Sequence, residues 1–180
     1  MTSPVTTAEL DLLLDTLSWA DADERALGRA RDVLAPQVED VLDLWYGYVG
    51  SKPQLVAAFA GRDGQPDAGY LAAVRTRFGE WILELCSPPY DQGWLDHQHE
   101  IAVRHHFEAK NRTDGIDSPS DHVPLRYLLA LTCPITATIR DFLAKGAADG
   151  AELDAMYTAW FKAVVLTVVL WSRPYVERGW

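Results

Sequence analysis

Four of the five histidines in this 180-residue chain fall within one segment, WLDHQHEIAVRHHFEAK (94–110). They are His97, His99, His105 and His106. Imidazole side chains can bind transition metals, transfer protons near neutral pH, or form hydrogen bonds inside a core. The spacing of the four histidines decides which of these roles is geometrically possible.

A zinc site within this segment conflicts with helix geometry. A helix turns about 100° per residue, so His97 and His99 would point about 200° apart. His99 and His106 would share a face, but a rise of about 1.5 Å per residue separates them by roughly 10 Å. Neither pair has HExxH spacing, and no cysteine lies nearby. We therefore expect neither a structural nor a catalytic zinc site here.

One histidine is predicted to face inward. Trp94, Gln98, Ile101 and His105 recur at steps of four, three and four. Because Trp94 and Ile101 are bulky and apolar, this stripe is predicted to face the core. His106 lies on a neighbouring stripe that is only slightly less apolar, so periodicity favours His105 by a small margin. An inward imidazole could bind a metal, or it could be a hydrogen-bonded core residue.

The elements that position these residues have helical periodicity throughout, which predicts an all-α protein. Its length and its 48% hydrophobic content suit a single domain over residues 1–180. Gly, Pro and Ser clusters divide the chain, with the longest loop at 111–124. Helices are expected at residues 7–18, 21–35, 37–49, 53–60, 67–86, 91–110, 125–145 and 151–172.

The charge balance excludes several partner classes. Lys and Arg total 16 against 26 Asp and Glu, a net charge of −10, so nucleic acids and anionic membranes would repel the chain. Cys86 and Cys133 are too few and too far apart for a disulfide framework or a zinc signature. The N-terminus lacks the basic and apolar pattern of a signal peptide. We expect a cytoplasmic protein with reduced thiols.

The last predicted helix is apolar on every side over residues 163–171. This stretch is shorter than the roughly 20 apolar residues that cross a bilayer, so we expect no membrane span. Such a helix is either fully buried or half covered by a second subunit. Residues 125–145 also carry apolar side chains beyond one stripe. We therefore expect a homodimer packed through helices 125–145 and 151–172.

The aromatic content is high, with seven Trp, seven Tyr and five Phe. A haem pocket requires apolar side chains against a flat macrocycle. It also requires a neutral imidazole whose second ring nitrogen is hydrogen-bonded. An all-helical chain with one inward histidine and many aromatic residues meets these requirements.

The chain also resembles the protoglobins, single-domain haem-binding globins related to the sensor domains of globin-coupled sensors. The resemblance runs from about Leu10 to Trp171 and implies a globin fold around haem b with an additional N-terminal helix. It rests on five blocks: VEDVLDLWYGYVGS (38–51), YLAAVRTRFGEWIL (70–83), YDQGWLDHQHEIAVRHH (90–106), RYLLALTCPITATI (126–139) and MYTAWFKAVVLTVVLWSRPYV (156–176).

The resemblance implies site residues. It places the proximal iron ligand at His105, and it leaves His97 and His99 at the surface. Val74 takes a position where other globins often have a distal histidine, so Tyr46 is expected to donate a hydrogen bond to a bound ligand. Tyr46 could instead be a packing residue only. The haem is expected to contact Trp45, Tyr46, Val74, Phe78, Ile101, Leu131 and Ile135.

The haem propionates are anionic and need a nearby cation in a chain this acidic. Arg77, beside Phe78, and Arg104, beside His105, are the candidates. Either arginine could instead be a solvated surface residue.

Three functions remain open from the sequence. The first is reversible binding of dioxygen, carbon monoxide and nitric oxide at a five-coordinate iron, as a gas sensor, carrier or scavenger. The second is an enzyme at the same iron, such as a nitric oxide dioxygenase, a peroxidase-like oxidoreductase or a catalyst of carbene-type transfer, although a distal histidine for acid–base work is missing. The third is a haem-free helical interaction module.

Overall fold

The computed structural model describes every residue except 62, 64, 116–117, 119 and 177. The described residues form helices and one isolated bridge between Ala60 and Pro66, with no strand, which confirms the all-α prediction. The helices are α1 (Thr7–Thr16), α2 (Asp21–Leu34), η1 (Ala35–Gln37), α3 (Val38–Gly50), α4 (Pro53–Val56), η2 (Ala57–Phe59), α5 (Ala68–Leu85), α6 (Gln92–His105), α7 (Lys110–Thr113), α8 (Leu125–Ala144), α9 (Gly150–Ser172) and η3 (Arg173–Tyr175).

Aspartate N-caps fix where the long helices begin. The carboxylate of Asp67 accepts the backbone N–H of Tyr70 at 2.7 Å at the start of α5. Asp91 accepts the N–H of Trp94 at 2.9 Å at the start of α6. Each cap satisfies one of the backbone donors that a helix leaves free at its first turn. The register of α5 and α6 is thereby set at both N-termini.

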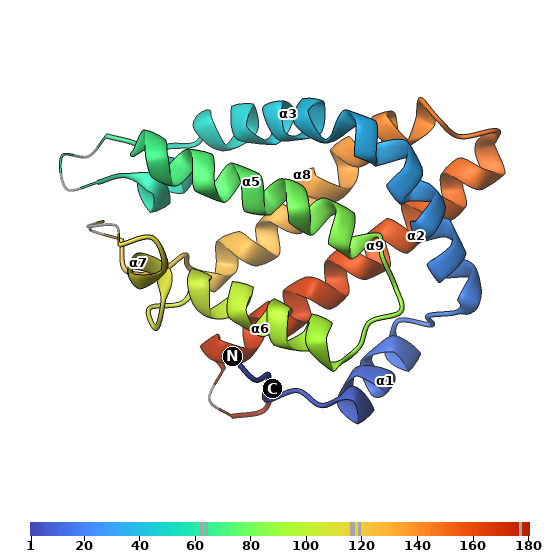
Figure 1. Ribbon diagram of the computed structural model, residues 1–180, viewed down its shortest axis with the longest axis horizontal. Coiled ribbons are helices and arrows are strands. Elements are labelled where there is room, and N and C mark those ends of the chain that lie inside the picture. The colour runs from blue at the N-terminus through green and yellow to red at the C-terminus, as the bar shows by residue number, and fades with distance from the viewer. Residues whose placement is uncertain (62, 64, 116–117, 119, 177) are drawn as a thin grey trace.

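The helices form two layers. In Figure 1, α5 and α6 lie in front of α8 and α9, which cross behind them. Helix α9 packs against α2, α6 and α8, and its Trp160 and Ala163 are fully buried. The last helix is therefore a central core element, one of the two arrangements that its apolar sequence allows.

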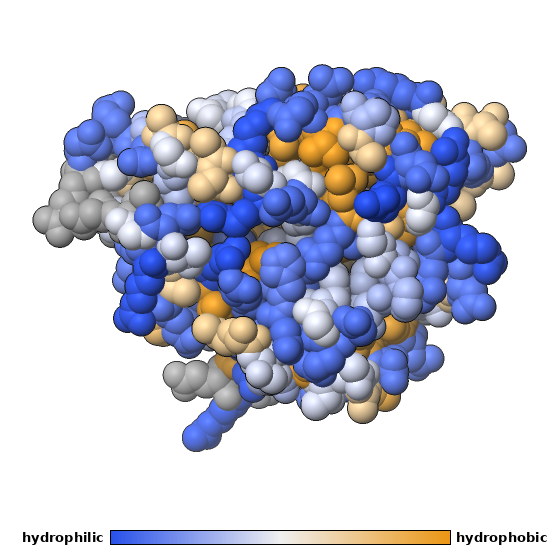
Figure 2. Space-filling model, viewed as in Figure 1, coloured by the Kyte–Doolittle hydropathy of each residue, from blue (hydrophilic) through white to orange (hydrophobic). Residues whose placement is uncertain are grey.

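Two helices, α8 and Gly150–Tyr175, are long and apolar enough by composition to cross a membrane. Half of the most apolar window in the second lies buried inside the domain. Hydrophilic side chains cover most of the face over α5 and α6 (Figure 2). The apolar sequence of α9 is thus accounted for by burial against its neighbouring helices.

A glycine allows α3 and α5 to approach each other. A Cβ atom added at Gly79 would lie 3.1 Å from Val38 Cγ1 and 3.3 Å from Leu42 Cδ1. These distances are shorter than ordinary side-chain contacts, so a larger residue would push the two helices apart. The close approach places Phe78, next to Gly79, against the α3 residue Trp45.

The histidine-rich helix is shorter than its sequence predicts. It ends at His105 instead of continuing to residue 110, because the backbone becomes extended at His106. The carbonyl of His105 accepts the N–H of Val123 at 2.7 Å, a tertiary bond that a continued helix would exclude. Lys110–Thr113 then form the separate helix α7, where the sequence indicated the end of one helix and the start of a loop. Residues 116–117 and 119 of that loop lie outside the described residues.

Candidate functional site

A cavity of about 550 Å³ lies between α3, α5, α6, α8 and α9. Its volume is within the usual range of small-molecule and cofactor sites. All the haem-site residues expected from the sequence line it, although their roles remain predictions. They are Trp45, Tyr46, Val74, Arg77, Phe78, Ile101, His105, Leu131 and Ile135.

His105 presents a neutral imidazole to the cavity. Its Nδ1 lies 2.8 Å from the carbonyl oxygen of Ile101. Because a carbonyl can only accept, Nδ1 must carry the proton, and Nε2 keeps its lone pair. Burial lowers the pKa of His105, and the nearby charges of Lys110 and Arg104 lower it further, whereas the bond to Ile101 raises it. The ring therefore has the tautomer and charge that an iron ligand requires.

The neighbouring histidines differ from His105. His106 is 4% exposed, but it lies outside the cavity wall and meets the Tyr175 ring edge-on at 5.0 Å. His97 was expected at the surface and is partly exposed, yet it also lines the rim of the cavity. Its Nδ1 lies 2.9 Å from a carboxylate oxygen of Glu84. Only His105 combines a position on the cavity wall with a backbone-oriented ring.

Aromatic rings form a continuous wall of the cavity. The centroids of Trp45 and Phe78 are 4.8 Å apart, those of Phe78 and Trp81 5.5 Å, and those of Trp81 and Trp171 5.7 Å. The indole N–H of Trp45 donates to the hydroxyl of Thr138 at 2.7 Å, which holds that ring in place. The wall is apolar and built from planar groups, as a flat macrocycle requires.

Tyr46 lies in this wall beside Phe78, with ring centroids 6.4 Å apart. Burial raises its pKa to about 12, so its hydroxyl stays protonated at neutral pH. Among the described residues, this hydroxyl forms no hydrogen bond within the chain. Tyr70 and Tyr127 also line the cavity, so potential donors are not limited to Tyr46. Three other lining hydroxyls already donate to backbone carbonyls: Thr113, Ser120 and Thr132.

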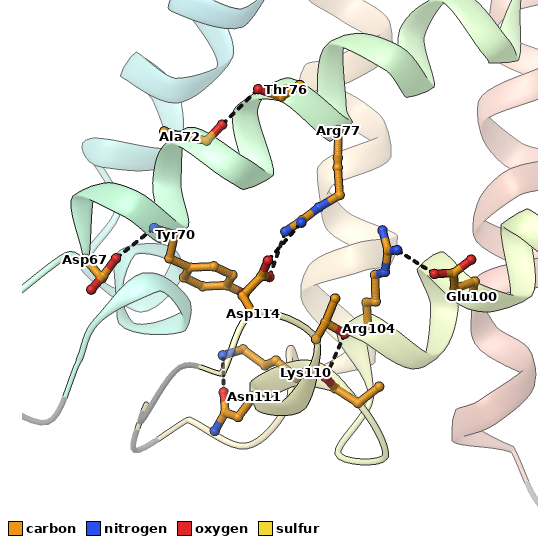
Figure 3. A network of polar contacts seen from close by, with 12 residues as sticks. Asp67, Tyr70, Ala72, Thr76, Arg77, Glu100, Arg104, Lys110, Asn111 and Asp114 are labelled. Carbon is orange, nitrogen blue, oxygen red and sulfur yellow. Dashed lines mark hydrogen bonds and ion pairs between the residues drawn. The ribbon is translucent and has the colours of Figure 1, made fainter.

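Charged side chains gather at one end of the cavity (Figure 3). Arg77 from α5 forms a bidentate pair with Asp114, with N–O distances of 2.9 and 2.8 Å. Arg104 from α6 pairs with Glu100 one turn earlier. Both arginines expected near the propionates thus line the cavity, and each already has a carboxylate partner.

Three important lining residues were not identified from the sequence: Trp81, Lys110 and Trp171. Because α9 is apolar on every side, it offers no single stripe. However, Val164, Val168 and Trp171 recur at steps of four and three and share the cavity face. Lys110 is the last residue of the helix predicted over residues 91–110, and lysines are usually exposed, so nothing in its type indicated burial.

The sequence matches the Protoglobin family model over residues 6–180. This chain belongs to the protoglobin family. Among solved structures, the protoglobin is similar to the globin domain of the Geobacter sulfurreducens globin-coupled sensor, with a TM-score of 0.68 and 14% sequence identity. The match covers 93% of this chain and 97% of that chain, and it shows a shared globin fold. A search of curated proteins finds no match.

Family membership makes the chain a globin-type haem protein. The cavity is suited to that group on its own chemistry. It has the His105 imidazole with its proton on Nδ1, an aromatic wall, and cationic side chains at one end. His105 would hold the iron, and the wall around Phe78 would contact the macrocycle.

Proposed function

We propose that this protoglobin binds haem b through His105 and reversibly binds diatomic gases, namely dioxygen, carbon monoxide and nitric oxide. The biological role would be that of a gas sensor, carrier or scavenger. When bound, haem would supply an iron that can take a diatomic gas as a ligand. The main support is the 2.8 Å contact from His105 Nδ1 to the Ile101 carbonyl, in the wall of an apolar cavity.

The chain's own residues account for ligand binding in this proposal. Ile101 fixes the tautomer of His105 and keeps Nε2 available. Val74, Leu131 and Ile135 offer only apolar atoms, so they exclude water and leave room for a small uncharged gas. Tyr46 donates a hydrogen bond to a ligand that carries partial negative charge.

The decisive experiment removes the imidazole side chain of His105 and then adds free imidazole to the solution. We expect His105→Gly to lower haem affinity by at least about 100-fold, since even partners of metal ligands contribute 10–100-fold. Added imidazole should restore the Soret band. His106→Gln is the matched control, because His106 is the adjacent buried histidine outside the cavity wall.

The spectra should be recorded in the ferrous state with and without carbon monoxide. Wild-type protein and His106→Gln should both show a reversible shift of the Soret band with the gas. If His105→Gly keeps wild-type haem affinity and spectra, or if His106→Gln loses them instead, the ligand assignment is wrong. A wild-type protein that does not bind added haem would contradict the whole proposal.

We also infer a homodimer formed through α8 and α9. Both helices are strongly apolar, and each leaves one large apolar side chain in solvent. Leu129 on α8 is 51% exposed, and Phe161 on α9 is 50% exposed. A second copy would cover these side chains in an isologous interface. Phe161→Glu should give monomers in sedimentation velocity, whereas Leu12→Glu, at an exposed leucine on α1, should not. Monomeric wild-type protein at micromolar concentration would contradict the dimer.

A cytoplasmic location is proposed from the thiols. Cys133 is exposed and Cys86 is buried, and neither forms a disulfide. Burial raises the pKa of Cys86 to about 12, which leaves that thiol unreactive. An exposed free thiol suits a reducing compartment. Cell fractionation of the tagged protein tests this location.

A further inference from the structure

Lys110 is a buried cation on the cavity wall. The side chain is 2% exposed, and it lines the cavity at the start of α7. Its ammonium donates to the backbone carbonyl of Ser120 at 3.0 Å and to Asn111 Oδ1 at 3.2 Å. The Nζ atom also lies 5.7 Å from the centroid of the Tyr70 ring. Both hydrogen-bond acceptors are neutral, so neither of them balances the positive charge.

The other cavity cations differ in this respect. Arg77 is paired with Asp114, and Arg104 is paired with Glu100. Among the described residues, no carboxylate lies within ion-pair distance of Lys110. Figure 3 shows Lys110 close to the Arg77–Asp114 pair, and all three residues line the cavity. Each arginine is paired with a carboxylate, so among the described residues Lys110 is the cavity cation for which no ion pair is formed.

An unbalanced buried ammonium is costly, and the cost falls when an anion reaches it. Burial lowers the pKa of Lys110, and the negative charge of Asp121 raises it. An ammonium has three N–H donors, and two of them are used by Ser120 and Asn111. The third donor and the charge are suited to a carboxylate of a ligand in the cavity.

We propose that Lys110 binds one propionate carboxylate of the haem. The proposal rests on the function proposed above, because haem is the anionic ligand that this cavity is inferred to hold. Without haem, Lys110 would tie the backbone at Ser120 to α7 and nothing more. If Lys110 binds a propionate, the effect of replacing it on the rate of ligand release should depend on the charge of the ligand. If Lys110 only stabilises the fold, the effect should be the same for charged and uncharged ligands.

The assignment is tested by varying two charges independently, that of the side chain at position 110 and that of the haem propionates. The variants are Lys110→Met, which removes the donors, and Lys110→Gln, which keeps amide donors for Ser120 but no charge. Lys110→Arg retains the charge. The two ligands are haem and haem dimethyl ester, whose propionates are uncharged. The measured quantity is the rate of ligand release to an excess of apomyoglobin at fixed salt concentration.

For haem, we expect Lys110→Met and Lys110→Gln to release the ligand at least about 10-fold faster than wild type, and Lys110→Arg to remain close to wild type. For the dimethyl ester, the uncharged variants and wild type should release at the same rate. Lys110→Gln gives this comparison even if Lys110→Met fails to fold.

Equal acceleration for both ligands would show that Lys110 acts only on the fold, and unchanged haem release in both uncharged variants would show that it touches no propionate. Either result overturns the assignment. A wild-type protein that binds neither ligand is a different result, because it contradicts the proposed function itself.

Discussion

The imidazole of His105 stacks on the indole of Trp171, with ring centroids 5.0 Å apart and planes inclined by 26°. Trp171 is held in turn by its own N–H, which donates to the Gln98 side chain at 3.1 Å. Gln98 is buried on α6, two helical turns before His105. The ring of His105 is therefore fixed twice, by the Ile101 carbonyl at Nδ1 and by Trp171 across its face.

Replacing Trp171 should loosen the proximal ligand without removing it. We expect Trp171→Leu to speed haem release by about 10-fold or more, in the range observed for residues that orient metal ligands. The iron–histidine stretching band in resonance Raman spectra should shift and broaden, because the imidazole can rotate about its remaining bond to Ile101. Trp180→Leu is the control, since Trp180 is an exposed tryptophan near the C-terminus. An unchanged Raman band in Trp171→Leu would show that stacking does not orient His105.

Removing the hydroxyl of Tyr46 tests its role as a donor. Tyr46→Phe should raise the dissociation rate of dioxygen about 10-fold, the effect of losing a hydrogen bond of about 1.4 kcal/mol. Carbon monoxide dissociation should change less, because that ligand carries less negative charge. Stopped-flow displacement measures both rates. Tyr70→Phe is the matched control, because Tyr70 also lines the cavity but lies near Lys110. If Tyr70→Phe accelerates release instead, the donor assignment moves to that residue.

The Arg77–Asp114 pair joins α5 to the segment that follows α7. Its two side chains are 30% and 18% exposed, so it is only partly screened by solvent. Asp114→Asn should lower the free energy of unfolding of the haem-free protein by about 1–2 kcal/mol, because Arg77 keeps its charge and loses its partner. Asp154→Asn breaks the more exposed pair with Arg140 and should cost less than about 0.5 kcal/mol. Urea titrations at pH 7 compare the two variants, and equal losses would contradict the argument.

The sequence predicts several cavity-lining residues of α5 and α8 because these residues lie on clear helical stripes. Phe78 and Val74 recur one turn apart on α5, and Leu131 and Ile135 do the same on α8. The position of His105 on the cavity wall likewise follows from its register with Ile101, one turn earlier, which also lines the cavity. Where a helix has one apolar face, periodicity identifies the residues that face the cavity.

The parts that the sequence did not predict depend on tertiary contacts. The end of α6 is set by the bond from Val123 to the His105 carbonyl, whereas the residues after His106 have ordinary helix propensity. Trp171 lies on a helix whose apolar residues cover every face, so its direction depends on what packs around α9. Lys110 becomes buried because the chain turns back over it at Ser120. Neither the end of α6 nor the burial of Lys110 has a local sequence signal, and the spacing of Trp171 with Val164 and Val168 is one of several apolar stripes on α9.

Histidine titration should make the haem-free fold sensitive to mild acid. The pKa values of His99, His105 and His106 are all lowered, in each case chiefly by burial. The unfolded chain, whose histidines keep a pKa near 6.5, therefore binds more protons than the folded chain as the pH falls below that value. By linkage, stability is complete above pH 6.5 and is lost progressively below it.

We expect the free energy of unfolding to fall between pH 7 and pH 5, by up to about 1.4 kcal/mol per pH unit for each proton taken up. Carboxylates with lowered pKa values, such as Glu9 and Glu152, titrate below this window and do not contribute to it. His106→Gln should reduce the slope, because it removes one of the buried histidines whose pKa is lowered. Urea midpoints at half-unit steps of pH measure the slope. A flat profile in the wild-type protein would mean that the buried imidazoles titrate as they do in the unfolded chain.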